Sequence, residues 1–400
     1  MTRIAMLLSC DTFESFFGKT FGLDKESYLT SYRNDFAWEY AAGLREQQIE
    51  TIIYVLSLKH SGFYETPDGF KVRFIPLAPW YRIVRRFVSR FKRFLWVTYL
   101  SELVNTLAFI DALPIYLAED SVSLLYIQEY WTNRFDFLID RVQLPIIGAD
   151  HGAKDTFAIK SNKRKSLPKA YKLVCQSHSE IEKVTGYGGN AILIPNAVDT
   201  EFYCPDPTER PTDKTVLTVA RLEDRQKRTS DLIRALQYLD NDWNLEIVGS
   251  GPDLKRLKSL AAKLGVSNRV RFLGFIRDKQ QLRSKYRQCS IFALPSAWEA
   301  VSLVVLEAMS CGAAVVTSNI EAFAGLIVPQ VTGVQVPVAD PILLAQGILV
   351  CYDNRLTLGM AARNRVVDTY SKPKMFAELA QVIHDYHAAA NPIHALAPVH

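Results

Sequence analysis

The second half of the sequence alternates between short apolar runs and longer amphipathic segments, and this alternation constrains the fold more than any other feature. Four mainly apolar runs predict strands, at 216–220, 245–248, 270–273 and 291–294. The segments between them predict helices, at 230–239, 252–264 and 279–288. A helix between successive strands makes the strands parallel and covers both faces of the sheet. This half of the chain therefore predicts a doubly wound α/β domain.

The first half has the same organisation in a less regular form. Its apolar runs predict strands at 4–8, 51–58, 71–76, 124–128 and 145–149. A chain of 400 residues that is 48% hydrophobic is long enough for two domains, each with its own core. We therefore expect two doubly wound parallel-sheet (Rossmann-like) domains at 1–195 and 196–372, followed by a helix at 373–390.

Composition argues against several classes of protein. No stretch resembles a signal peptide, and no run approaches the roughly 18 apolar residues of a membrane-spanning helix. The six cysteines form no C-x-x-C pair, which favours free thiols in a reducing cytoplasm over disulfides or zinc. The basic stretches carry no signature of a nucleic-acid-binding fold. We expect a cytoplasmic protein without a nucleic-acid partner.

Basic charge is concentrated in the segment between Asp68 and Glu102, which holds eight basic residues and no acidic one. Residues 80–100 within it predict a helix. One face of this helix is apolar, formed by Trp80, Val84, Phe87, Phe91, Phe94 and Leu95, and most other positions are basic. Such a helix suits the surface of an anionic membrane, so peripheral membrane contact through 80–100 is one expectation. The alternative is a core helix whose apolar face packs on the sheet while its arginines are solvated.

The stretch 295–319 carries the strongest chemical signal. A strand stops at Pro295, Ser302 is placed to cap a helix, and Gly312 is placed to end that helix. Glu299 lies in the loop, and Glu307 follows it by eight residues on the helix. The free N–H groups of a helix start bind anions, whereas carboxylates accept hydrogen bonds from hydroxyl groups. A nucleotide sugar needs both, for its diphosphate and for its ribose and hexose.

The spacing E-x7-E within PS-x-x-E…LEAM-x-C-G-x-x-VV resembles the signature of the retaining family-4 glycosyltransferases, which have the GT-B fold. The resemblance implies that Glu299 meets the donor sugar and that Glu307 holds the ribose hydroxyls. It also implies two domains that face a cleft, with 1–195 binding the acceptor and 196–372 binding the nucleotide sugar. The helix at 373–390 is then expected to cross back to the first domain. The family usually has Gly-Phe-Gly after the first Glu, where this chain has Ala-Val-Ser. Backbone N–H groups of Ser302, Leu303 and Val304 are then the donors expected for the diphosphate.

Other positions match the family in the same domain. Arg221 and Lys227 follow the strand at 216–220, and two cations there stabilise the negative charge that develops on a departing diphosphate. Arg228 stands where the family usually has a glycine. The resemblance also implies that Gly249 lies beside the donor nucleotide sugar. It implies that the backbone near Phe275 and Ile276 contacts the nucleobase.

The first domain matches the family mainly through its pattern. His151 follows the strand at 145–149, where the family places a histidine near the donor sugar. In an open α/β sheet, the residues just beyond the strand ends line the ligand crevice. This position favours a catalytic role for His151 over a structural role. A long aromatic segment at 11–33 replaces the glycine pair usual after the first strand. It is expected to be either part of an acceptor pocket or a mobile surface insertion.

The leading interpretation is a retaining glycosyltransferase that moves a hexose from a nucleoside diphosphate sugar to a hydroxyl group. The expected nucleotide is UDP. The acceptor is expected to be a glycan, a lipid-linked molecule or a small molecule. The family's front-face mechanism needs no enzymatic nucleophile, and the sequence has no convincing D-x-D metal motif, so we expect metal-independent activity without a cofactor. Two alternatives stay open: a sugar-nucleotide epimerase on the same fold, and a catalytically silent sugar-nucleotide-binding protein. A phosphorylase would need a Schiff-base lysine and a pyridoxal site, which the sequence does not indicate.

Overall fold

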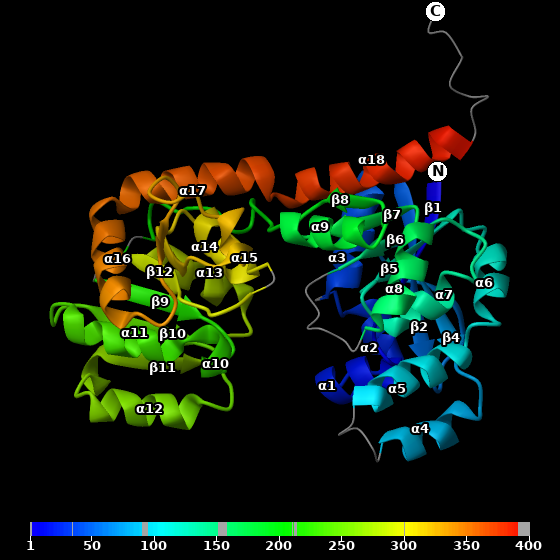
Figure 1. Cartoon of the computed structure of the whole chain (residues 1–400), viewed down its shortest axis with the longest axis horizontal. Helices are drawn as coiled ribbons and strands as arrows, with labels where there is room; N and C mark the ends of the chain where they lie inside the picture. The colour runs from blue at the N-terminus through cyan, green and yellow to red at the C-terminus, as the bar shows by residue number, and fades with distance from the viewer. Residues whose placement is uncertain are drawn as a thin grey trace, which may run out of the picture. The chain divides into compact units, whose positions relative to one another are not determined.

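The computed structural model describes residues 2–33, 35–89, 95–150, 158–209, 211, 214–299 and 301–390. The chain folds into two compact units (Figure 1). The first unit contains the residues up to Ile194 and the segment from Phe376 on, and the second unit is Pro195–Met375.

The first unit is built on an eight-stranded sheet with the order β3-β4-β2-β1-β5-β6-β7-β8. The strands are β1 (Thr2–Leu7), β2 (Ile49–Ser57), β3 (Gly62–Glu65), β4 (Lys71–Pro76), β5 (Leu124–Gln128), β6 (Ile146–Ala149), β7 (Lys172–Cys175) and β8 (Ala191–Leu193). All neighbours are parallel except β3, which pairs antiparallel with β4. The predicted parallel sheet is therefore confirmed, and β3 is an addition that the sequence did not indicate.

The helices of this unit connect the strands. They are η1 (Glu14–Gly18), α1 (Lys19–Phe21), α2 (Lys25–Thr30), α3 (Phe36–Glu46), α4 (Tyr81–Ser89), α5 (Leu95–Leu107), α6 (Leu113–Glu119), α7 (Asn133–Leu138), α8 (Lys160–Ser166), η2 (Leu167–Lys169) and α9 (His178–Gly186). A cluster of buried side chains from β1, β2 and β5 and from the helices forms the core of one sheet face.

Of the two expectations for 11–33, the mobile surface insertion is wrong, and the role in an acceptor pocket stays a prediction. The segment contains η1, α1 and α2, and it is anchored in the unit by buried aromatic rings. Phe13 packs against Tyr28 and Phe74 with ring centroids 5.4 and 5.3 Å apart. Glu14 accepts hydrogen bonds from the Ser57 hydroxyl and from the backbone at 58 and 59. Aromatic burial therefore orders a segment that lacks a clear helical period.

The single helix expected at 80–100 is also wrong, because α4 and α5 are two helices that pack against each other. Residues 90–94 between them lie outside the described part. Phe91 and Phe94 of the predicted face fall in that interval. The rest of the apolar surface is divided. Tyr81 and Val88 are buried, whereas Trp80, Ile83 and Phe87 are 41%, 65% and 63% exposed. Helix α4 thus packs on the unit through one apolar side and presents a second apolar side to solvent.

The second unit is a fully parallel six-stranded sheet with the order β11-β10-β9-β12-β13-β14. The strands are β9 (Thr215–Val219), β10 (Asn244–Val248), β11 (Val270–Gly274), β12 (Ile291–Leu294), β13 (Val315–Ser318) and β14 (Val334–Val336). The helices are α10 (Asp224–Lys227), α11 (Thr229–Ala235), η3 (Leu236–Tyr238), α12 (Leu254–Lys263), η4 (Ser267–Arg269), α13 (Lys279–Gln288), α14 (Leu303–Ser310), α15 (Glu321–Ala324), α16 (Pro341–Asp353) and α17 (Arg355–Thr369).

Alternate residues of these strands enter two different cores, as a doubly wound sheet requires. Val216 packs with residues of α11, α12 and α16, whereas Leu217 packs with residues of α13, α14 and α17. Ile291 and Phe292 divide between the two cores in the same way. The predicted α/β fold is confirmed in this unit.

The last helix, α18 (Lys372–Ala390), starts in the second unit, and from Phe376 on it belongs to the first. The Phe376 ring meets Tyr40 of α3 edge-on, with centroids 5.2 Å apart. Gly43 makes this approach possible, because a Cβ added there would lie 2.1 Å from the Phe376 ring. Farther along, the His387 ring hydrogen bonds to Ser123 at 3.2 Å.

Candidate functional site

The order of strands in the second unit creates a switch point between β9 and β12. From β9 the chain moves outward to β10 and β11, and it then returns to the other side of β9 as β12. Ligands of open α/β sheets bind at such a point, beyond the carboxyl ends of the strands. Lys227 follows β9 and Glu299 follows β12. Both predicted residues therefore come from the two strands that flank the switch point.

Lys227 and Glu299 form an ion pair, with 2.5 Å between Nζ and Oε1. The Glu299 side chain is only 7% exposed. The Ser296 hydroxyl donates to the same carboxylate oxygen at 2.6 Å. A carboxylate this deeply buried needs such partners, because an unpaired buried charge is strongly destabilising. The pair fixes a cation and an anion at the end of the sheet.

Backbone contacts hold the loops that carry this pair. The N–H of Ala297 donates to the carbonyl of Gln226 at 2.7 Å, and the Gln226 side chain donates to the carbonyl of Trp298 at 3.2 Å. The loop after β12 is thus tied to the short helix α10 that ends at Lys227. The geometry of the Lys227–Glu299 pair therefore depends on these hydrogen bonds between the loop and α10 as well as on the two side chains.

Arg228, which stands in the place of the family's glycine, has φ 54° and ψ 31°. This is the left-handed region, where glycine costs least. The guanidinium group compensates by binding Asp231 through two nitrogens, at 2.8 and 3.1 Å. Burial raises the pKa of Asp231, and the Arg228 bond opposes that rise.

Because Arg228→Gly and Arg228→Ala both remove the ion pair with Asp231, they differ mainly in backbone freedom. We expect the Gly variant to be more stable than the Ala variant by about 1 kcal/mol, since only glycine tolerates this φ without strain. Thermal unfolding of the two full-length variants measures the difference. An Ala variant as stable as the Gly variant would show that the backbone here is unstrained.

Glu307 lies on α14 and accepts a hydrogen bond from the Tyr286 hydroxyl at 2.8 Å. The hydroxyl of Tyr203 is a second donor to the same carboxylate. Burial raises the pKa of Glu307, and the two phenol hydrogen bonds work in the opposite direction. Two buried rings therefore orient this carboxylate, which has further lone pairs available for hydroxyl groups.

Ser302 occupies the N-cap position of α14, but its side chain makes no capping hydrogen bond, so that part of the expectation is wrong. Its carbonyl instead accepts from the N–H groups of Val305 and Leu306. The N–H groups of Leu303 and Val304, the first two residues of the helix, have no intrahelical acceptors. Gly312 ends the helix as predicted, with φ 80° and its N–H on the carbonyl of Met309.

Gly249 follows β10 with φ 135°, and a Cβ at this position would lie 1.9 Å from the carbonyl oxygen of Ala220. A glycine is therefore needed to bring the ends of β9 and β10 together. Phe275 and Ile276 follow β11 on the same edge of the sheet. Phe275 is 69% exposed, while Ile276 packs against the core shared with α14.

Arg221 differs from the other predicted residues because its side chain is 72% exposed and lies 3.8 Å from the carboxylate of Glu223. The structure therefore joins Lys227 to Glu299 without including Arg221. His151 lies outside the described residues. In the part of the chain that is described, no group of three or more His, Cys, Asp or Glu side chains could hold a metal ion.

Sequence reasoning missed Ser296, Tyr203 and Tyr286. Ser296 stands at the strand stop that the sequence analysis identified, and a hydroxyl three residues before Glu299 was a usable signal. The two tyrosines are distant in sequence from Glu307, and their burial looks like ordinary core packing. Only the tertiary structure shows that their hydroxyls meet the carboxylate.

Residues 199–367 match the family described as "Glycosyl transferases group 1". The chain is also 30% identical over 223 residues to the GDP-mannose-dependent alpha-(1-6)-phosphatidylinositol monomannoside mannosyltransferase of Mycolicibacterium smegmatis. That match covers 50% of this chain and 58% of the relative, so the chain spans less than two thirds of the relative's length.

Two solved structures have a similar fold. Sucrose-phosphate synthase of Thermosynechococcus elongatus superposes with a TM-score of 0.70 at 18% identity, covering 97% of this chain and all of that one. HepE of Anabaena in complex with UDP gives 0.69 at 17% identity, covering 96% of this chain and all of that one. Residues 199–367, most of the second unit, thus match the group 1 glycosyl transferases, and the chain has the GT-B fold of two Rossmann-like units.

Proposed function

We propose that this chain is a retaining glycosyltransferase that uses a nucleoside diphosphate sugar as donor and a hydroxyl group as acceptor. The observation that carries the proposal is the largely buried Lys227–Glu299 pair at the switch point of the second sheet. It supplies a fixed cation for a diphosphate and a fixed acceptor for sugar hydroxyls. A catalytically silent binding protein would need the same cation and the same acceptor to bind the nucleotide sugar. Measured turnover of the donor is therefore what distinguishes an enzyme from such a protein.

Each part of the donor has a proposed partner in the second unit. The diphosphate would meet Lys227, Arg221 and the first-turn N–H groups of α14. The ribose hydroxyls would donate to Glu307, which Tyr286 and Tyr203 hold in place. The hexose would meet Glu299. The exposed side chain of Arg221 is then free to move onto the diphosphate when the donor binds.

In the proposed front-face reaction the acceptor oxygen forms a bond to the anomeric carbon while the bond from that carbon to the diphosphate oxygen breaks. The acceptor proton passes to the leaving diphosphate, so no side chain has to act as nucleophile. Negative charge grows on the diphosphate as it leaves. Fixed cations lower the barrier most when they face a position where charge develops.

UDP is the nucleotide that we propose for the donor, and the HepE structure with UDP supports it. The mycolicibacterial relative is named as GDP-mannose-dependent, which makes GDP the necessary comparison. A thermal-shift series with UDP, GDP and their hexose derivatives tests the proposal. A ligand at 100 times its Kd stabilises the folded state by about 2.7 kcal/mol. If no nucleotide shifts the midpoint, the proposed donor site is wrong.

Activity is expected to survive EDTA. Lys227, Arg221 and the start of α14 supply positive charge where a metal ion would otherwise be needed. Release of nucleotide from the donor that stabilises the protein should proceed at the same rate with and without chelator. Loss of turnover in EDTA that is restored by Mg²⁺ or Mn²⁺ would contradict this expectation.

We also propose that α4 contacts an anionic membrane surface. Trp80, Ile83 and Phe87 form an exposed apolar side of this helix, and exposed Arg82 and Arg86 flank it. Apolar side chains of such a helix enter the headgroup region, and each arginine near an anionic surface contributes about 1 kcal/mol. The relative from M. smegmatis is named for a phosphatidylinositol-based substrate, which supports an acceptor at a bilayer. Within the described residues no helix is long and apolar enough to cross a membrane.

The double variant Arg82→Gln/Arg86→Gln should bind vesicles containing anionic lipid roughly 30-fold more weakly than the wild type, which corresponds to about 2 kcal/mol. Sedimentation with the vesicles at low salt measures this binding. The matched control, Arg141→Gln/Lys165→Gln, removes two exposed charges from elsewhere in the same unit and should bind like the wild type. Equal losses in both variants would mean that net charge, and not α4, attracts the protein to the vesicles.

A further inference from the structure

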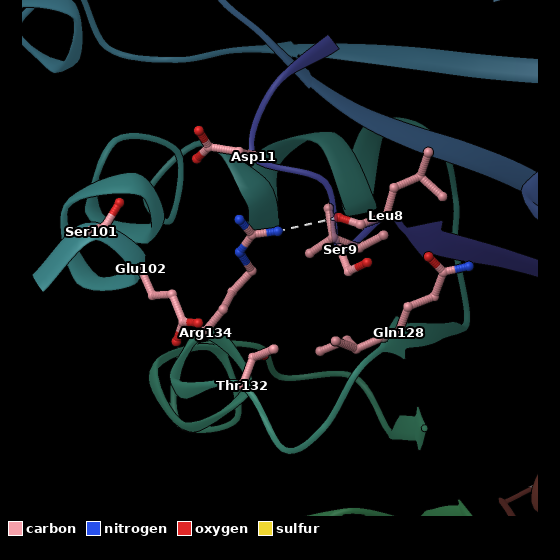
Figure 2. A pocket seen from close by; sticks show the side chains of 10 residues that line it. Leu8, Ser9, Asp11, Ser101, Glu102, Gln128, Thr132 and Arg134 are labelled. Carbon is pink, nitrogen blue, oxygen red and sulfur yellow. Dashed lines mark hydrogen bonds between the residues drawn. The ribbon is translucent and has the colours of Figure 1, made fainter. Parts of the chain in front are cut away.

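The six cysteines are free thiols, and they differ in exposure. Four of them are buried, whereas Cys10 and Cys204 are half-buried. Cys10 belongs to the first unit, where its carbonyl accepts a hydrogen bond at 3.3 Å from Arg134, a residue of the pocket drawn in Figure 2. Its thiol lies deep enough for burial to raise its pKa to about 12. Cys204 belongs to the second unit and has a cation beside its sulfur.

That cation is Arg287, whose side chain is 5% exposed. Its Nη2 donates to the Cys204 sulfur at 3.4 Å, and its Nε donates to the Cys204 carbonyl at 2.6 Å. A neighbouring cation stabilises the thiolate, which is the form of cysteine that reacts with oxidants. Burial alone would lower the pKa of Arg287, but Glu209, Cys204 and the nearby sulfur of Cys311 raise it. Two sulfurs therefore share one guanidinium group.

The backbone brings Cys311 alongside Cys204, because the residues on both sides of the two cysteines are in contact. Before them, the Ser310 hydroxyl donates to the Tyr203 carbonyl at 2.5 Å. After them, Gly312 lies so close to the proline that follows Cys204 that an added Cβ would be 3.2 Å from the proline ring. Such flanking contacts bring a cysteine pair within the reach of a disulfide, which is roughly 7 Å between Cα atoms.

We propose that Cys204 and Cys311 form a reversible disulfide when the protein meets hydrogen peroxide, and that this bond weakens the nucleotide site. The Cys204 thiolate attacks the peroxide, the O–O bond breaks, and the sulfur becomes a sulfenic acid as hydroxide leaves. The Cys311 sulfur then attacks the Cys204 sulfur, so that the S–S bond forms and the S–O bond breaks. Water leaves with the Cys311 proton. The two thiols lose two electrons to one peroxide, and a dithiol reductant reverses the reaction.

Burial assigns the two cysteines to different steps. Cys311 is 4% exposed, and burial raises the pKa of its thiol to about 12 while Arg287 opposes the rise. A shielded thiol of this kind suits the second step. Cys289 is a rival partner for Cys311, but it is 5% exposed, and burial raises the pKa of its thiol as well. Of these three cysteines, peroxide reaches Cys204 first.

Both ends of the disulfide lie next to groups of the proposed ribose site. Tyr203 precedes Cys204 in the chain, and its hydroxyl donates to the Glu307 carboxylate. Glu307 lies one helical turn before Cys311, and its carbonyl accepts from the Cys311 N–H at 3.0 Å. Closing the bond draws the Cys204 sulfur away from Arg287 and acts on the backbone beside Tyr203. This effect on the site rests on the proposed function, whereas formation of the disulfide does not.

Peptide mapping of the full-length protein tests the disulfide. The reduced protein is treated with hydrogen peroxide, its remaining thiols are alkylated, and the digest is analysed without reductant. We expect two of the six thiols to be lost, a peptide that links Cys204 to Cys311, and full recovery of both thiols in dithiothreitol. Cys204→Ser should abolish the link, whereas the controls Cys10→Ser and Cys289→Ala should keep it. Unchanged thiols, or a link between Cys289 and Cys311, would overturn the proposal.

Calorimetric titration with UDP, and with GDP in parallel, tests the effect on the site. The oxidised protein should bind the preferred nucleotide at least fivefold more weakly than the reduced protein, and dithiothreitol should restore the affinity. Oxidation should not change the affinity of Cys204→Ser. Tyr203→Phe should form the disulfide but show a smaller loss of affinity on oxidation, since it lacks the hydroxyl that reaches Glu307. A complete link with unchanged affinity would overturn the control of the site. The peptide map uses no nucleotide, so it succeeds or fails independently of the proposed donor site.

Discussion

Lys227→Ala is expected to lower kcat by roughly 10²-fold or more, because it removes a fixed cation from the place where charge develops on the leaving diphosphate. Nucleotide release from the preferred donor, measured at saturating acceptor, gives the value. Arg221→Ala should have an effect of similar size through the same diphosphate. Arg225→Ala provides a matched control, since it removes an exposed cation from the same short helix as Lys227. Its turnover should stay within about twofold of the wild type.

The Lys227 variant alone leaves Glu299 buried without its cation, so a second variant is needed to separate the two effects. In Lys227→Ala/Glu299→Gln the unpaired charge is gone, while Ser296 can still donate to the side-chain carbonyl of the glutamine. If Lys227 acts on the diphosphate, turnover of the double variant falls roughly 10²-fold or more below that of Glu299→Gln alone. Turnover equal to that of Glu299→Gln alone would mean that Lys227 serves only to neutralise Glu299.

Glu307→Gln is expected to weaken binding of the free nucleoside diphosphate by about 10- to 100-fold, since hydrogen bonds to a charged group contribute roughly 1.5–3 kcal/mol. The proposed contact is to the ribose, which the free nucleotide and the intact donor share. Glu299→Gln should weaken only the intact donor. Calorimetric titration of both variants with the free nucleotide and with the nucleotide sugar measures the contrast.

A nucleotide lacking the 2′-hydroxyl supplies the control for Glu307. The wild type should bind 2′-deoxy-UDP more weakly than UDP, whereas Glu307→Gln should discriminate between the two much less. Tyr286→Phe keeps the carboxylate and removes one of the donors that orient it, so its effect should be smaller than that of Glu307→Gln. Undiminished discrimination in Glu307→Gln would show that another residue holds the ribose.

The strands of the second unit could be predicted to within about a residue because each is a short apolar run with turn residues on both sides. Strand β14 (Val334–Val336) was missed, since three residues are too few to define a period. Helix α4 was predicted as part of a longer helix with one apolar face. Its true division depends on packing, because Tyr81 enters the core while Ile83, two residues later, faces solvent.

The candidate site was predictable only in part. The positions of Lys227 and Glu299 after two strands follow from the pattern of apolar runs, and the sheet topology explains why the two meet. Their ion pair, the Ser296 hydroxyl and the phenols around Glu307 depend on contacts between segments far apart in the chain. Local sequence patterns cannot predict contacts between residues that are so far apart in the chain.

The most direct test of the donor site is a crystal structure of the full-length protein with the nucleoside diphosphate that stabilises it most. We expect the diphosphate to lie against Lys227 and the start of α14, with the ribose hydroxyls within about 3 Å of the Glu307 carboxylate. A nucleotide bound elsewhere on the second unit, or in the first unit, with Lys227 still engaged only with Glu299, would contradict the proposed function.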